Sequence, residues 1–206
     1  MHQIYIISVG PGSRDYVTQT ALKTALICDV IIGMDYQVNA IDVRADSTVF
    51  VQSDINSILD LIDSNAGKKI GVLVTGDAGI FSLSRKIMER FGCESVVEII
   101  PGVSSIQTAF ARIMESWVNV KIYSFHGRAL SGIDEILTLE RAAILCGSDH
   151  NSKMVLTELT EAGLFQKQRI IYVCQNLTFS DERIIRINNE RDILNLQPSR
   201  REIIIL

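Results

Sequence analysis

Three glycine-containing turns carry the residues of this chain that could hold a ligand. The first turn (residues 10–13) contains Pro11, the second (residues 75–79) contains Thr75, Gly76 and Asp77, and the third (residues 101–105) ends in two serines. Glycine lets the backbone come close to a ligand, and carboxyl and hydroxyl groups can hydrogen-bond it. These residue types favour the binding of a polar small molecule.

Each of these polar groups also has a common structural role. Asp77 stands where it would cap the helix expected after the second turn, and Ser104 and Ser105 stand before another expected helix. The recurrence of three turns, each directly after an apolar run, favours a binding site instead. If those runs are parallel strands, all three turns lie on the edge of the sheet where α/β proteins bind ligands. The three spaced glycines of a dinucleotide-binding fingerprint are absent, so NAD binding has little support.

The elements that must position the turns alternate between strand-like and helix-like segments. In the first half, short apolar runs predict buried strands, and apolar residues at helical spacing predict helices between them. In the second half the strands alternate more, which is typical of a mixed sheet with an exposed face. We therefore expect an α/β protein with two halves, residues 1–113 and 114–206. The expected strands are residues 4–9, 30–33, 49–51, 70–74, 96–100, 117–125, 142–146, 169–174, 182–187 and 201–206, with helices near 15–26, 55–62, 80–91, 105–113 and 154–164.

Composition excludes several other classes of protein. The chain of 206 residues is 47% apolar and carries a net charge of -4, which argues against a nucleic-acid surface. It contains no apolar run long enough to span a membrane and no secretory signal at its start. The four cysteines and three histidines are scattered, so we expect free thiols in a reducing, cytoplasmic compartment and no metal site.

One further segment, His126-Gly127-Arg128, combines two groups that bind carboxylates or phosphates. It is equally consistent with a solvated loop.

The motifs together resemble the tetrapyrrole methylases over essentially the whole chain. The resemblance is carried by Ser8-Val9-Gly10-Pro11-Gly12, Gly76-Asp77 and Pro101-Gly102-Val103-Ser104-Ser105, in that order and spacing. It implies two α/β/α subdomains with a cofactor cleft between them, and S-adenosylmethionine (SAM) as the methyl donor. It also implies which residues contact the cofactor: Pro11, Thr75, Gly76, Asp77, Ile80, Ser104, Ser105, Cys146 and Leu177.

Within the family, two segments are similar to the type that methylates C5 of cobalt-precorrin-7 in anaerobic cobalamin biosynthesis. These segments are residues 124–128 and residues 175–184. The resemblance implies a corrinoid substrate whose carboxylates meet His126 and Arg128, and no nucleophilic residue or metal. It also implies a homodimer, and a separate methyltransferase and decarboxylase for the C15 step that contacts this protein transiently.

Two positions depart from the family pattern, and two other functions stay open. Ser8 stands where the family usually has glycine, and Ala78 where it usually has proline. The first alternative is another reaction of the family, at a different ring carbon or on the modified histidine that diphthine synthase methylates. The second is a non-catalytic nucleotide-binding module, which would not need the polar set His126, Arg128 and Asn176.

Overall fold

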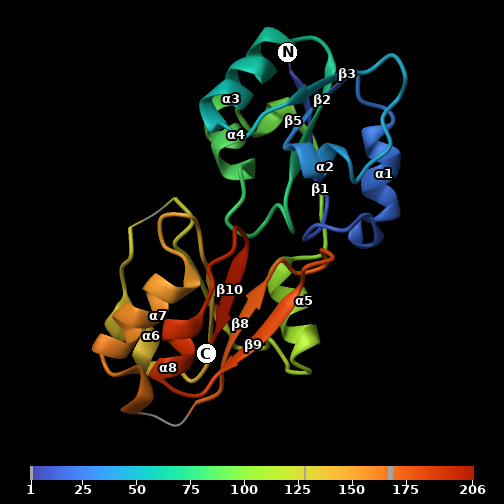
Figure 1. Cartoon of the computed structure of the whole chain (residues 1–206). Coiled ribbons are helices and arrows are strands. Elements are labelled where there is room, and N and C mark those ends of the chain that lie inside the picture. Colours follow the sequence, from blue (N-terminus) through green and yellow to red (C-terminus); the bar gives the residue numbers. More distant parts are fainter. Residues whose placement is uncertain (1, 128, 167–168) are drawn as a thin grey trace. The chain divides into compact units, whose positions relative to one another are not determined.

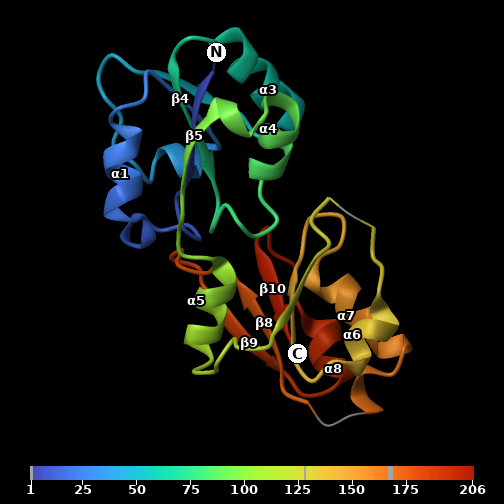
Figure 2. The same ribbon diagram turned by 180° about the vertical axis from the view of Figure 1, so that it is seen from behind.

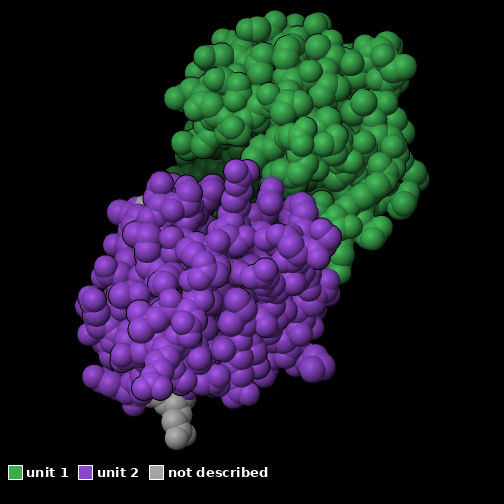
Figure 3. Space-filling view, viewed as in Figure 1, with its two compact units in different colours: residues 1–105 green, residues 106–206 purple. Residues whose placement is uncertain are grey.

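The computed structural model describes residues 2–127, 129–166 and 169–206 and divides the chain into two compact units. Unit 1 comprises residues 1–105 and unit 2 residues 106–206 (Figure 3). The sequence placed the division after residue 113, whereas here it follows Ser105, the first residue of helix α5 (Ser105–Arg112). The reason is packing, because Ile106, Ala109 and Phe110 of α5 are fully buried in a core cluster of unit 2.

Unit 1 is built on a five-stranded parallel sheet, as the sequence predicted for the first half. The strand order is β3-β2-β4-β1-β5, with every pair parallel. β1 and β4 lie side by side, with Ile6 opposite Val72 and Ser8 opposite Val74. Both faces of these two strands are buried, which explains their nearly continuous apolar sequences. The strands are β1 (Gln3–Ser8), β2 (Val30–Gly33), β3 (Thr48–Val51), β4 (Lys69–Val74) and β5 (Val96–Ile100).

Helices cover both faces of this sheet (Figure 1). Helix α1 (Gln19–Ala25) packs on one face, and α3 (Ile55–Ser64) and α4 (Ser84–Phe91) pack on the other. The connection after the strand β1 therefore leads to one face of the sheet, and the connection after the neighbouring strand β4 leads to the other face. In open α/β sheets such a crossing point, at the carboxyl ends of the strands, is where ligands bind.

Unit 2 contains a mixed sheet of order β6-β7-β10-β8-β9, of which β10, β8 and β9 are labelled in Figure 2. Only β6 and β7 run parallel, and the other pairs are antiparallel. Helix α5 packs on one face of the sheet, and three helices pack on the other. The elements are β6 (Lys121–Ser124), α6 (Ile133–Thr138), β7 (Ala142–Leu145), α7 (Ser152–Glu161), β8 (Ile171–Gln175), β9 (Arg183–Ile187), α8 (Glu190–Asn195) and β10 (Glu202–Ile205).

The structure differs from the sequence prediction in three places. The helix after the second turn begins at Ser84, not directly after Asp77. The strand expected over residues 117–125 covers only Lys121–Ser124, because residues 117–120 form a turn in which Asn119 has a positive φ of 61°. Helices α2 (Asp35–Val38), α6 and α8 were not expected, since four to six residues are too few to show a helical repeat.

None of the helices in the described part of the chain combines the length and apolar character needed to cross a membrane.

Candidate functional site

The three turns of unit 1 are joined to one another at the carboxyl ends of β1, β4 and β5. The N–H of Gly76 donates to the carbonyl of Gly10 at 2.7 Å, which links the first and second turns. The N–H of Gly102 donates to Asp77 Oδ2 at 3.0 Å, which links the second and third. The sequence therefore correctly predicted that the turns lie on one edge of the sheet.

Asp77 holds two of the turns together and does not cap a helix. Its Oδ1 accepts the N–H of Gly79 at 2.8 Å, while its Oδ2 accepts that of Gly102. Helix α4 begins seven positions later in the chain, with Leu83 at its N-cap and no side-chain cap. The alternative in which Asp77 caps this helix is wrong, because the chain makes a further turn at residues 78–83 before the helix starts. Asp77 remains half-buried, with its carboxylate fixed by backbone donors.

Gly102 is a glycine because the end of β1 and the second turn leave no room for a side chain there. A Cβ at this position would lie 2.5 Å from both the carbonyl oxygen of Gly76 and Cβ of Ser8. Gly10 is needed for a different reason, since its φ of 72° is unfavourable for other residues. A Cβ there would also lie 2.8 Å from the carbonyl oxygen of Tyr16. The glycines thus permit the close contact between the turns.

Thr75 has two polar neighbours that the sequence analysis missed. Gln37 Nε2 donates to Thr75 Oγ1 at 2.8 Å, and the Tyr36 hydroxyl is hydrogen-bonded to the same oxygen. Both neighbours belong to α2, directly after β2. Gly33 is the signal that could have revealed them. It ends the buried strand β2, and a glycine also stands within two residues after the ends of β1, β4 and β5. A fourth strand end therefore reaches the same edge of the sheet.

The remaining predicted residues of unit 1 lie in or beside the three turns. Pro11 is buried, and Ile80 is half-buried in a turn closed by its N–H to the carbonyl of Asp77 at 3.1 Å. Ser104 is 3% exposed and directly precedes α5, of which Ser105 is the first residue. The N–H nitrogen of Ser105 lies 3.6 Å from where a Cβ on Gly76 would be. The structure thus brings all seven predicted cofactor residues of unit 1 to one region.

In unit 2 the predicted residues lie at the ends of β6, β7 and β8. Leu177 is buried in the core cluster that contains α5, and Cys146 follows β7. Burial, and then the neighbouring Glu202 carboxylate, raise the pKa of the Cys146 thiol, which is therefore uncharged. His126 is exposed and lies against Gly147, where a Cβ would be 2.9 Å from His126 Cα. Arg128 lies outside the described residues.

A buried carboxylate, not singled out in the sequence, organises this end of unit 2. Glu202 is 3% exposed and accepts three hydrogen bonds: from the N–H of Ser152 at 2.7 Å, from Gln175 Nε2 at 2.7 Å and from the N–H of Ser199 at 2.8 Å. These donors belong to the segments after β7, at the end of β8 and before β10. Glu202 therefore holds in place the two segments that carry Cys146 and Leu177.

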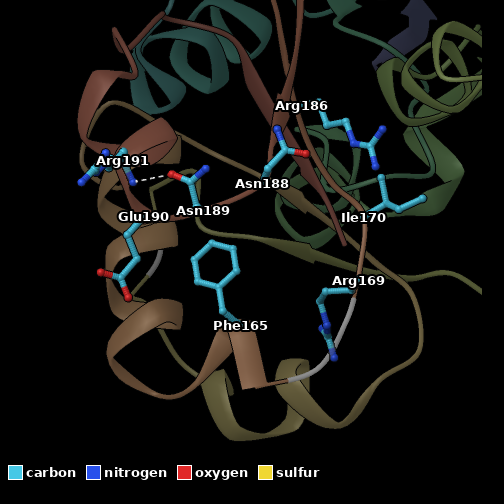
Figure 4. Close-up of a pocket in the computed structure, with 8 residues that line it drawn as sticks. All are labelled: Phe165, Arg169, Ile170, Arg186, Asn188, Asn189, Glu190 and Arg191. Atoms are coloured by element: carbon cyan, nitrogen blue, oxygen red, sulfur yellow. Dashed lines mark hydrogen bonds between the residues drawn. The ribbon is translucent and has the colours of Figure 1, made fainter.

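Unit 2 also has a surface hollow of about 910 Å³ that contains none of the predicted residues. Arginines contribute to its lining, but Figure 4 shows Arg186 and Arg191 on opposite sides of it. They do not form a single anion site. Within residues 2–127, 129–166 and 169–206, no three His, Cys, Asp or Glu side chains are grouped so as to hold a metal ion.

Curated relatives match this chain over most of its length. A probable cobalt-precorrin-7 C(5)-methyltransferase of Methanocaldococcus jannaschii is 27% identical over 184 residues, 88% of this chain and 87% of the relative. The cobalt-precorrin-7 C(5)-methyltransferase of Salmonella typhimurium is 25% identical over 179 residues, 87% of each chain. A relative named for another ring position, the cobalt-precorrin-4 C(11)-methyltransferase of M. jannaschii, is 27% identical over 203 residues, 89% of this chain and 78% of the relative.

Solved structures show the same fold. The precorrin-6Y methylase of Archaeoglobus fulgidus superposes with a TM-score of 0.75 at 22% identity, covering 100% of this chain and 98% of that one. The uroporphyrin-III C-methyltransferase of Thermus thermophilus, complexed with S-adenosylhomocysteine, gives 0.77 at 16% identity over 98% of this chain and 96% of that one. The model of the tetrapyrrole (corrin/porphyrin) methylases matches residues 3–191, a range that contains all three turns. The chain belongs to this family.

Proposed function

We propose that this protein transfers a methyl group from SAM to C5 of cobalt-precorrin-7 in anaerobic cobalamin biosynthesis. The observation that carries the proposal is the similarity to C5-methyltransferases from an archaeon and a bacterium, each covering at least 87% of both chains. The likeness of residues 124–128 and 175–184 to the C5 type supports the same choice.

The joined turns of unit 1 fit a SAM site chemically. SAM, when bound, supplies a methyl group on a positively charged sulfonium that needs no further activation. The half-buried Asp77 carboxylate would favour that positive charge. Because such a transfer depends mainly on alignment, the hydrogen bonds that fix the turns to one another would serve to hold the donor still. Thr75, Gly76, Ile80, Pro11, Ser104 and Ser105 are the other proposed cofactor contacts in unit 1.

In unit 2, Cys146 and Leu177 are the proposed cofactor contacts, and His126 and Arg128 the proposed substrate contacts. A corrinoid carries many carboxylates, which an exposed imidazole and a guanidinium would bind. The uncharged state of the Cys146 thiol argues for packing against the cofactor, not for nucleophilic attack.

Two further parts of the proposal concern assembly and location. Met114 and Val118, 92% and 68% exposed, and the neighbouring Trp117 in the same short segment are exposed apolar side chains of the kind that interfaces cover. They support a homodimer and a transient contact with a separate C15 methyltransferase and decarboxylase, and light scattering of the purified protein checks the dimer. The three buried free thiols support a reducing, cytoplasmic location.

The proposed reaction is tested in two steps. Calorimetric titration with S-adenosylhomocysteine (SAH) should show micromolar binding. The protein is then incubated with SAM carrying a ¹³C-methyl group and, separately, with cobalt-precorrin-7 and cobalt-precorrin-4. NMR should find the label on C5 of the first compound and no transfer to the second. Transfer to C11 of cobalt-precorrin-4 alone would replace the C5 assignment by that of the C11 relatives, and absence of SAH binding would overturn the methyltransferase itself.

A further inference from the structure

The hydroxyl of Thr75 lies at the centre of a small hydrogen-bond network. Gln37, a residue that is 1% exposed, donates from Nε2 to Thr75 Oγ1 at 2.8 Å, and Tyr36 is hydrogen-bonded to the same oxygen. A threonine hydroxyl can accept two hydrogen bonds and donate one. The bonds that Gln37 and Tyr36 make to this hydroxyl determine whether Thr75 can donate to a ligand or accept from it.

The orientation of the Gln37 amide follows from its other partner. Oε1 accepts the backbone N–H of Met34 at 2.7 Å. A backbone N–H can only donate, so the amide oxygen must face Met34 and the amide NH₂ must face Thr75. Gly33 preserves this arrangement, because a Cβ there would lie 3.1 Å from Gln37 Oε1 and 2.9 Å from Leu73 Cβ. Thr75 therefore accepts from Gln37.

The Tyr36 bond uses the second acceptor position of Thr75. A phenol O–H is more strongly polarised than an aliphatic O–H and is the better donor of the two. When Tyr36 donates, both lone pairs of Thr75 Oγ1 are occupied. The hydroxyl hydrogen of Thr75 is then left for a third partner outside this network.

We propose that Gln37 and Tyr36 make Thr75 a hydrogen-bond donor to the carboxylate of the cofactor's amino-acid group. This inference rests on the proposed use of SAM and adds which group of SAM the Thr75 hydroxyl binds. The carboxylate is the only anionic group of SAM and SAH, and a hydrogen bond to a charged acceptor is stronger than one to a neutral oxygen. Thr75 touches the ligand, while Gln37 and Tyr36 are positioning residues.

The test compares SAH with its decarboxylated analogue by calorimetric titration. In Thr75→Val, affinity for SAH should fall by about 10- to 100-fold, as for a lost hydrogen bond to a charged group. Affinity for the analogue should stay within about twofold, because it has no carboxylate for Thr75 to bind. Thr75→Ser, which keeps the hydroxyl, should retain the preference for SAH.

Gln37→Glu tests the positioning role. Its ionised carboxylate would accept from both Met34 and Thr75, and so turn the Thr75 hydrogen away from the ligand. The preference for SAH should be lost although Thr75 is present, and lowering the pH until the new carboxyl is protonated should restore it. If the buried charge prevents folding, the two Thr75 variants decide alone.

The outcomes separate this inference from the proposed function. Wild type that binds neither ligand overturns both. If wild type binds SAH, the Thr75→Val variant decides the inference. Equal loss of affinity for both ligands, or no loss for either, overturns only the inference and indicates that the Thr75 hydrogen goes to Tyr36.

Discussion

The hydroxyl of Ser8 accepts a hydrogen bond from the backbone N–H of Ala78 at 2.9 Å. The two residues are the positions at which this chain departs from the usual family pattern of glycine and proline. Proline has no N–H, so a chain with proline at position 78 needs no hydroxyl at position 8 to accept a hydrogen bond. Here the Ala78 N–H is buried, and it would lack an acceptor without Ser8. The two departures therefore compensate each other.

Replacing only one member of this pair should destabilise unit 1. Ser8→Gly leaves the Ala78 N–H buried without an acceptor, which costs about 1–3 kcal/mol. Adding Ala78→Pro removes that donor and should recover much of the loss, so the two changes should be clearly non-additive. Urea unfolding of wild type, both single variants and the double variant measures the coupling. Ser53→Gly, at an exposed serine, controls for the flexibility of glycine in the unfolded chain. Additive effects would contradict the compensation.

Asp77→Asn separates the structural role of Asp77 from its charge. One of the two backbone N–H groups now bound by the carboxylate would face an amide NH₂, so the free energy of unfolding should fall by about 1–3 kcal/mol. If the negative charge favours the sulfonium, the variant should lose more affinity for SAM than for the uncharged thioether SAH. Titration with both ligands measures this, with Asp134→Asn on α6 as an exposed control. Equal losses of affinity for SAM and SAH would show that Asp77 only holds the turns together and that its charge does not favour the sulfonium.

The sequence predicted the strands and the turns of unit 1 well because their signals are local. β2 was expected at the residues where it lies, and the buried runs before the turns were found within one or two residues. The alternative in which Asp77 caps a helix is wrong, because its carboxylate links two turns and its second partner, Gly102, is 25 residues away. No local pattern distinguishes a helix cap from a link between two turns.

The residues that were missed depend on contacts across the sheet. Gln37 lies in a helix of four residues, and its partner Thr75 follows another strand 38 residues later. Glu202 belongs to an apolar strand end, and its donors come from three separate segments. Such buried polar groups are visible only once the pairing of the strands is known.

Only one of the four thiols should react in the folded protein. Cys28, Cys146 and Cys174 are buried, and burial raises the pKa of Cys28 and of Cys174 to about 12. Since the thiolate is the reactive form, these thiols should resist alkylation at pH 8, whereas the exposed Cys93 should not. Mass spectrometry after iodoacetamide should find one modification in native protein and four in denaturant. Rapid modification of Cys146 in the native state would contradict its placement in the core.

Removing the Glu202 carboxylate should loosen unit 2. Glu202→Ala leaves a buried amide and two backbone N–H groups without their acceptor, so the loss should be about 3–5 kcal/mol. Glu190→Ala, at an exposed carboxylate on α8, provides the matched control. Hydrogen exchange should show the opening first at residues 146–152 and 197–202. Unchanged protection there would show that the three segments are held by packing alone.

Glu182 should make the stability of unit 2 depend on pH in the acid range. Its side chain accepts from Arg112 Nε at 2.6 Å and from the N–H of Thr178 at 2.6 Å, and the Arg112 bond is the main cause that lowers the pKa of this carboxyl from its ordinary value of 4.5. A carboxyl whose pKa is lower in the folded state stabilises the fold above its ordinary pKa, and that contribution is lost as the pH falls through the folded value. Glu182→Gln should therefore be less stable than wild type at pH 7, by about 1 kcal/mol for this partly exposed pair, and the difference should shrink below pH 4.5. Urea unfolding of both proteins from pH 7 to pH 3 measures this difference in stability. Thr178 has a left-handed conformation, with a φ of 70°. A difference that stays constant from pH 7 to pH 3 would show that the ionised Glu182 carboxylate is not what holds Thr178 in that conformation.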